Sequence, residues 1–161
     1  MGSEMCIRDS YRYDEEDLLT YKKIPSAEPV LYAYNNLDLL GGYQDGFLSN
    51  LNQWYTYDYD SYGREIEQGF FNGSPSTNFA PSDPQITTIY GTSLHERDKV
   101  KRVETKILGT NTELYTQNTY ATCGMLIRQD GNNHLNTSNS ANLNIYSVSY
   151  THLTLPTKRI V

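Results

Sequence analysis

Alternating polar and apolar residues recur in short stretches along this chain, and polar turn residues separate the stretches. In three of them, at residues 11–13, 32–34 and 57–59, tyrosine occupies the first and third positions. Side chains two residues apart point to the same face of a β-strand, so each tyrosine pair marks one face of a strand. Glycine, proline and asparagine are frequent between the stretches, as is typical of tight turns. The pattern predicts an all-β chain built from many short strands.

Four stretches can be aligned as a repeat. Each begins with the tyrosine positions, continues with a turn of about four residues, and then resumes with an apolar residue. In the first three units the second tyrosine recurs after 21 and then 25 residues. The repeat positions are Tyr11, Tyr13, Asp14 and Asp17; Tyr32, Tyr34, Asn35 and Asp38; Tyr57, Tyr59, Asp60, Gly63 and Arg64; and, in a degenerate fourth unit, Tyr120 and Gly124.

The residues after the second tyrosine predict a specific turn. Asp and Asn are favoured at the first position of a type I turn, where the side chain accepts a backbone N–H. Three residues later such a hairpin needs a positive φ, which glycine adopts freely and Asp tolerates. Each unit is therefore predicted to be a β-hairpin, and hairpins of this size are stable only when neighbours cover them. The return strands are expected to start near Leu19, Leu40, Ile66 and Leu126.

The third unit carries the most specific signature. Residues 57–64 read YDYDSYGR, which matches the pattern YxYDxxGR, and the chain resembles the YD repeats of Rhs-type secreted bacterial proteins. Residues 22–30 and 43–46 resemble the segments between such repeats. In the first two units aspartate replaces the glycine and leucine replaces the arginine. In the fourth unit alanine and methionine replace the Asp and Arg.

The resemblance implies an open, curved sheet of consecutive antiparallel hairpins that forms part of a larger shell. It implies a structural, non-catalytic role in toxin encapsulation and delivery or in cell contact, at a secreted or cell-surface location. Neighbouring repeats of the same parent chain, and an enclosed toxin domain, are the implied partners. The alternative is a carbohydrate-binding surface that uses exposed tyrosines. No cofactor is expected.

The chain divides into five parts on this reading. Both ends resemble translated sequencing-adapter sequence, so residues 1–10 and 148–161 are expected to lie outside the fold. Three hairpins occupy residues 11–71, and a polar insertion loop with a short strand occupies 72–101. Further hairpins, including the degenerate unit, occupy 102–147.

Within the second half the expected elements are less regular. A strand is predicted at 86–90, followed by a charged stretch with at most one helical turn. A hairpin is predicted from residues 102–108 and 113–120, and a further strand at 125–129. The run 130–133 is a strong turn signal, and a last strand is expected near 143–146.

Composition and charge exclude several classes of function. The formal net charge is −6 at pH 7, which argues against binding nucleic acid through its phosphates. No apolar run approaches the length of a membrane-spanning helix. The two cysteines, Cys6 and Cys123, have no metal-ligand pattern around them.

Candidate chemistry is sparse. The carboxylates that flank the third turn could act as an acid–base pair if a cleft held them apart, but the turn already explains Asp60. Cys123 and His134 lack the third group of a nucleophilic site, and the scattered aspartates form no calcium loop. Enzymatic activity is therefore not expected. The carboxylates concerned are Asp58, Asp60, Glu65 and Glu67.

Overall fold

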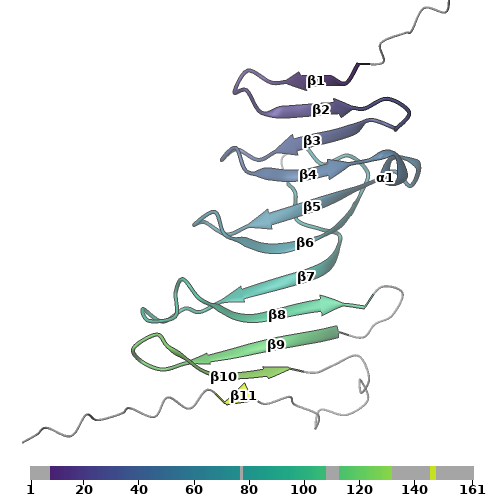
Figure 1. Cartoon of the computed structure of the whole chain (residues 1–161). Helices are drawn as coiled ribbons and strands as arrows, with labels where there is room; N and C mark the ends of the chain where they lie inside the picture. Colours follow the sequence, from purple (N-terminus) through teal and green to yellow (C-terminus); the bar gives the residue numbers. More distant parts are fainter. Residues whose placement is uncertain (1–7, 77, 108–112, 132–145, 148–161) are drawn as a thin grey trace, which may run out of the picture.

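The computed structural model describes residues 8–76, 78–107, 113–131 and 146–147. Within them, eleven β-strands form one sheet in which each strand pairs with its neighbours in the sequence, so the spatial order is the chain order (Figure 1). The strands are β1 (Ser10–Tyr13), β2 (Leu19–Lys23), β3 (Val30–Tyr34), β4 (Leu40–Gln44), β5 (Gln53–Tyr59), β6 (Glu65–Asn72), β7 (Asp83–Tyr90), β8 (Val100–Lys106), β9 (Glu113–Tyr120), β10 (Leu126–Gly131) and β11 (Tyr146–Ser147).

All pairs of adjacent strands are antiparallel. The prediction of an all-β chain of consecutive antiparallel hairpins in an open sheet is therefore confirmed. The sheet is open and is not rolled up over the described strands. No helix among the described residues is long and apolar enough to cross a membrane.

Five hairpins share one irregularity next to their turns. In the β1–β2 hairpin Tyr13 pairs with Leu19, whereas Arg12 pairs with Tyr21, so one residue of the return strand is skipped. Such a bulge bends the strand and increases its twist. The five turns lie at the same end of the strands, at the left of Figure 1. The same shift occurs where Tyr34 pairs with Leu40, Tyr59 with Glu65, Tyr90 with Val100 and Tyr120 with Leu126.

One of these hairpins, β7–β8, was not recognised in the sequence. Its strand begins at Asp83, three residues before the predicted start. The charged stretch that follows contains turns rather than a helix, and the Gly91 N–H donates to the Lys99 carbonyl at 3.0 Å to close it. Tyr90 thus occupies the place of the second tyrosine in a hairpin whose turn has been lengthened.

A small second layer covers one face of β4 and β5. The helix α1 (Gly46–Asn50) follows β4, and Asp45 caps its N-terminus by accepting the Leu48 N–H. Leu48 is 5% exposed, and Trp54 on β5 is 8% exposed. The sequence did not predict this helix, because its five residues are too few to show a helical period.

The connection from β6 to β7 completes this layer. It was predicted to be a polar insertion on the surface, but it carries Phe79, which is only 5% exposed. A methyl group at Gly41 on β4 would lie 2.6 Å from the Phe79 ring, so the ring packs directly on the backbone of that strand. The expectation of a purely superficial loop was therefore wrong. The buried ring was missed because the surrounding residues are polar.

The opposite face of the sheet is lined with aromatic side chains. Tyr55 lies beside Tyr43 and Tyr57, with ring centroids 5.7 and 5.6 Å apart, and beside Phe70 at 5.4 Å. The edge-to-face arrangement of Tyr55 with Tyr57 and with Phe70 is favourable for aromatic rings. These side chains are half-buried, so the predicted shared face of the tyrosines is present.

Several predicted features lie wholly or partly outside the described residues. These are the leader, of which only residues 8–10 are described, and the tail at 148–161. The loop 108–112 and most of the predicted turn at 130–133 are likewise not described. The predicted pairing of the strands on either side of the loop 108–112 is confirmed, because β8 pairs with β9.

Candidate functional site

The turns have the predicted construction. In the third hairpin Asp60 accepts the Tyr62 and Arg64 N–H groups through one carboxylate oxygen, at 2.9 and 3.0 Å. The backbone closes the same turn, because the Gly63 N–H donates to the Asp60 carbonyl at 2.9 Å. Asp14 and Asn35 make the equivalent pairs of side-chain bonds in the first two hairpins. Asp17, Asp38, Gly63 and Gly124 all have a positive φ, as the repeat predicted.

A tyrosine hydroxyl links one hairpin to the next at three junctions. Tyr34 donates to the Leu19 carbonyl at 3.0 Å, and Tyr59 donates to the Leu40 carbonyl at 2.8 Å. Tyr120 donates to the Val100 carbonyl at 2.7 Å. In every case the donor is the second tyrosine of a unit, and the acceptor is the first residue of the preceding return strand. The repeat therefore encodes its own junction, which the sequence analysis did not foresee because it involves residues 15 to 20 positions apart.

Burial raises the pKa of two of the junction tyrosines, Tyr34 and Tyr59. Desolvation is the largest cause for Tyr34 and Tyr59, and nearby acidic groups add to it. Tyr57, on the same face, has its pKa raised to about 12, again chiefly by burial and then by the neighbouring Tyr43. The phenols of Tyr34, Tyr57 and Tyr59 therefore remain protonated at neutral pH, so the hydroxyls of Tyr34 and Tyr59 are hydrogen-bond donors there.

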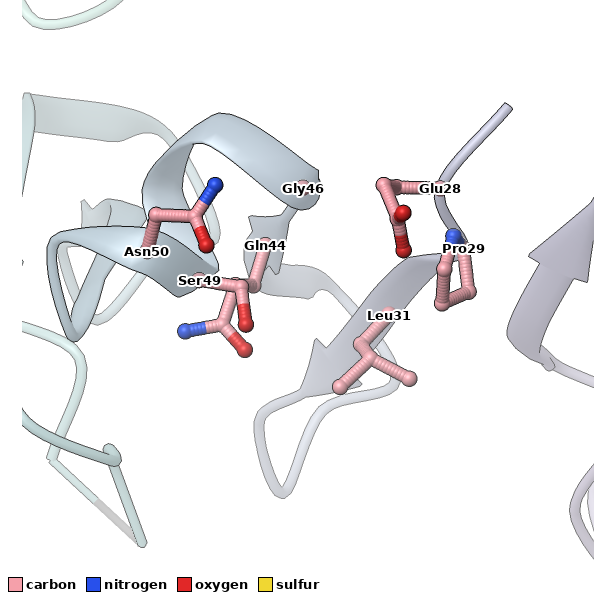
Figure 2. Close-up of a pocket in the computed structure, with 7 residues that line it drawn as sticks. All are labelled: Glu28, Pro29, Leu31, Gln44, Gly46, Ser49 and Asn50. Atoms are coloured by element: carbon pink, nitrogen blue, oxygen red, sulfur yellow. The ribbon is translucent and has the colours of Figure 1, made fainter. Parts of the chain in front are cut away.

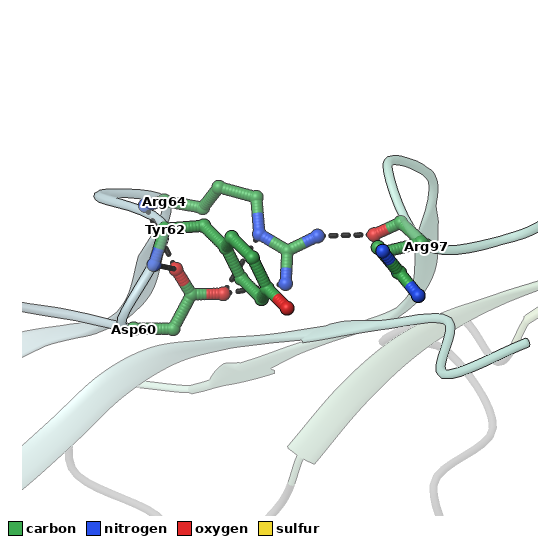
Figure 3. A network of polar contacts seen from close by, with 4 residues as sticks. All are labelled: Asp60, Tyr62, Arg64 and Arg97. Atoms are coloured by element: carbon green, nitrogen blue, oxygen red, sulfur yellow. Dashed lines mark hydrogen bonds and ion pairs between the residues drawn. The ribbon is translucent and has the colours of Figure 1, made fainter. Parts of the chain in front are cut away.

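The junction between the third hairpin and the next is built differently. Tyr90 makes no hydrogen bond to the Glu65 carbonyl, although both residues are described. Instead, Arg64 donates to the backbone carbonyl of Arg97 in the long β7–β8 turn, as Figure 3 shows. The Arg64 guanidinium also lies 4.1 Å from the centroid of the Tyr90 ring. The arginine of the signature thus takes over the role that a tyrosine hydroxyl plays elsewhere.

Asp60 holds that arginine in place. Its carboxylate contacts the Arg64 guanidinium at 2.7 and 2.5 Å, and the Tyr62 ring lies beside the same guanidinium at 5.1 Å (Figure 3). Desolvation acts against the ionised form of Asp60, but hydrogen bonds from Arg64 outweigh it and lower the pKa of the carboxyl. Nε and Nη2 of Arg64 both bind the same carboxylate oxygen, Oδ2, and these two contacts hold the guanidinium against Asp60.

Glu65 departs from the repeat. It pairs with Tyr59 at the position where the other four hairpins place leucine or valine. No hydrogen bond or ion pair joins its carboxylate to another described residue. Burial raises its pKa above the ordinary value of 4.5, so the folded chain favours the protonated form of this carboxyl.

We expect Glu65→Gln to increase the free energy of unfolding at pH 7 and to have less effect in acid. A carboxyl whose folded pKa is raised contributes stability that is complete below its unfolded pKa and is lost as pH rises through its folded pKa. The substitution removes that loss. Urea denaturation at pH 7 and near pH 4 measures the difference, with Glu67→Gln on the same strand as the control. An equal gain at both pH values would contradict the assignment.

A hollow lies beside α1 (Figure 2). Its lining residues come from the β2–β3 turn, β3, β4 and the helix; they are Glu28, Pro29, Leu31, Gln44, Gly46, Ser49 and Asn50. The Gln44 amide is already engaged, because it donates to the Gln53 carbonyl at 2.8 Å. Gly46 lies directly against the Glu28 side chain. The hollow therefore marks where the turn packs against the helix, and it gathers no set of catalytic groups.

Among the carboxylates considered for catalysis, Asp58 lies opposite Glu67 in the β5–β6 pair, and Asp58 and Asp60 line one hollow beside the third turn. The carboxylate of Asp58 accepts the backbone N–H of Tyr59 at 3.0 Å, while Asp83 pairs with Lys106 and Asp130 with Arg128. No group of three or more His, Cys, Asp and Glu side chains within the described part of the chain is suited to hold a metal ion. Cys123 is exposed at the β9–β10 turn, and His134 lies outside the described residues.

No model of a known protein family matches this chain, and no curated protein matches it.

Proposed function

We propose that this chain is a structural repeat segment of an Rhs-type secreted or surface shell, with a non-catalytic role in toxin encapsulation and delivery or in cell contact. The observation that carries the proposal is the recurring tyrosine junction. The hydroxyls of Tyr34, Tyr59 and Tyr120 each bind the main chain of the preceding hairpin. A main-chain acceptor imposes no requirement on the neighbour's side chain, so the same junction can be repeated along a wall of any length.

The paired motif residues support the same proposal. Asp60 and Arg64 form a rigid pair whose guanidinium reaches the following hairpin. Tyr59, Asp60, Gly63 and Arg64 are thus accounted for by turn formation and by contacts between hairpins, and the Tyr57 ring packs against Tyr55. A signature whose members all serve the fold is typical of a scaffold, and the sequence resemblance supplies the class of shell.

We expect Tyr59→Phe to lower the free energy of unfolding by about 1 kcal/mol, because one neutral hydrogen bond at a half-buried junction is lost. Tyr57→Phe is the matched control, since its hydroxyl makes no hydrogen bond to a described residue and its change should be within about 0.5 kcal/mol. Denaturation followed by the fluorescence of the single tryptophan, Trp54, gives both values.

Amide hydrogen exchange extends this test from stability to mutual dependence. Tyr59→Phe should speed exchange in β4, which supplies the acceptor, as well as in β5. An effect confined to β5, or an equal loss in Tyr57→Phe, would contradict the view that each hairpin depends on the next.

Carbohydrate binding is the alternative function, and it would use the exposed rings. Tyr62 is 68% exposed at the tip of the third turn. However, the guanidinium of Arg64 already covers one face of its ring. We therefore expect Tyr62→Ala to leave any glycan-array signal of the chain unchanged. A sugar whose binding is abolished by that substitution, with the fold retained, would favour the alternative.

A further inference from the structure

The first strand lies at the edge of the sheet, at the top of Figure 1. Its last residue, Tyr13, is the second tyrosine of the first unit and is 59% exposed. The Tyr13 hydroxyl makes no hydrogen bond with any residue that the structure describes. Tyr11, two residues earlier, differs, because its hydroxyl donates to the carboxylate of Asp9 at 3.1 Å.

The other junctions show what a tyrosine in this position binds. Tyr34, Tyr59 and Tyr120 all donate to the carbonyl of the first residue of a return strand. The strand pairs at these junctions, β2–β3, β4–β5 and β8–β9, have the same relative register. If each register is continued toward the turn, the acceptor residue lies opposite the residue just before the tyrosine. Three independent copies of one geometry therefore define the partner expected for the Tyr13 hydroxyl, which bonds none of the described residues.

We propose that the edge of β1 is a docking site for the return strand of one further hairpin of this repeat, whose first carbonyl accepts the Tyr13 hydroxyl. The inference rests on the proposed function, since it names the partner of the same junction. The docked strand runs antiparallel to β1, and its first residue lies opposite Arg12. Unpaired backbone groups along the edge supply the remaining hydrogen bonds, as in other cases of strand addition.

The orientation excludes β1 of a second copy as the occupant. A return strand starts at the end of the sheet where the turns lie, so its first carbonyl is beside Tyr13. The turn that precedes this strand then lies in line with the other five turns. Two β1 strands paired antiparallel would instead place their turns at opposite ends of the strands in the combined sheet.

The experiment supplies the missing hairpin from the chain itself. A second copy of residues 9–29, which holds β1, β2 and the turn that leads to β3, is inserted immediately before Asp9 of the full chain. The original Tyr13 then stands to the copied Leu19 as Tyr34 stands to Leu19 in the parent. We expect the amides of the original β1 to become protected from hydrogen exchange. Tyr13→Phe should reduce that protection about fivefold in the duplicated chain and should have no effect in the parent.

Two matched variants identify the cause. Tyr11→Phe should leave β1 protection unchanged in the duplicated chain, because its hydroxyl already has a partner. A duplicated chain with Tyr21→Pro in the inserted copy should lose the protection, because proline cannot donate in the strand ladder. Equal effects of Tyr13→Phe in both chains, or absence of added protection, would overturn the inference. So would a dimer of the parent chain with β1 already protected.

Tyr34→Phe in the same duplicated chain separates this inference from the proposed function. If Tyr34→Phe lowers the protection of β3 but Tyr13→Phe leaves β1 unchanged, the docking site is wrong and the internal junctions stand. If neither substitution has an effect, the premise that tyrosine junctions hold the hairpins together fails as well.

Discussion

Phe79→Ala is expected to lower the free energy of unfolding by about 3–5 kcal/mol, the usual cost of removing a buried phenylalanine. The ring is 5% exposed and rests on the backbone of β4 at Gly41. It covers the sheet together with Leu48 and Trp54, which are the other buried apolar side chains of the described chain. With so few members in this layer, no neighbour can move to fill the space that the ring leaves.

Phe47→Ala is the matched control, because Phe47 on α1 is 70% exposed. The same chemical change there should alter stability by no more than about 0.5 kcal/mol. Urea denaturation measured by Trp54 fluorescence compares the two. Similar losses in both variants would mean that the connection does not pack on the sheet as described.

The local parts of this fold could be predicted from the sequence, because their causes are local. Asp14, Asn35 and Asp60 cap their turns with their own side chains, and the positive φ falls three residues later. These interactions span at most four residues, so the repeat displays them directly. The pairing of consecutive strands follows from them, since a tight turn leaves little choice of partner.

The parts that were missed depend on distant residues. Phe79 stands among polar residues, and only the glycine at position 41 on another strand makes room for its ring. Tyr90 was passed over because a long turn separates it from Val100, although the strands resume the common register beyond that turn. A search for single tyrosines that precede an apolar strand, without a fixed turn length, would have found this hairpin.

The degenerate hairpins suggest how much of the signature each junction requires. The β9–β10 hairpin has alanine where the others have Asp or Asn, yet its backbone bonds and its tyrosine junction are retained at 2.8 and 2.7 Å. The β7–β8 hairpin has neither the turn residues nor the hydroxyl bond, and the Arg64 contact compensates from the preceding unit. The register shift is the feature common to all five. The bulge is therefore the property that the repeat maintains, and the motif residues are several ways of achieving it.

Gly69→Ala should have the second large effect, a loss of about 3 kcal/mol, at the upper end of the usual cost of overpacking. Gly69 lies opposite Pro84 where the register between β6 and β7 shifts. A methyl group there would meet the Asp83 carbonyl and would lie 2.8 Å from both the Pro84 Cα and the Gln85 nitrogen. These are backbone atoms, so no side-chain rotation can relieve the contact. Denaturation should show the loss, whereas Glu67→Ala on the same strand should change stability by about 0.5 kcal/mol or less.

The position of Gly69 gives this substitution a second, more specific consequence. Within the described sheet β6–β7 is the one pair that joins strands β1–β6 to strands β7–β11. Weakening it should uncouple the halves, so that amides of β8 and β9 exchange faster while those of β4 and β5, beneath the buried layer, change less. A uniform increase throughout the sheet would show instead that the hairpins unfold as one cooperative unit.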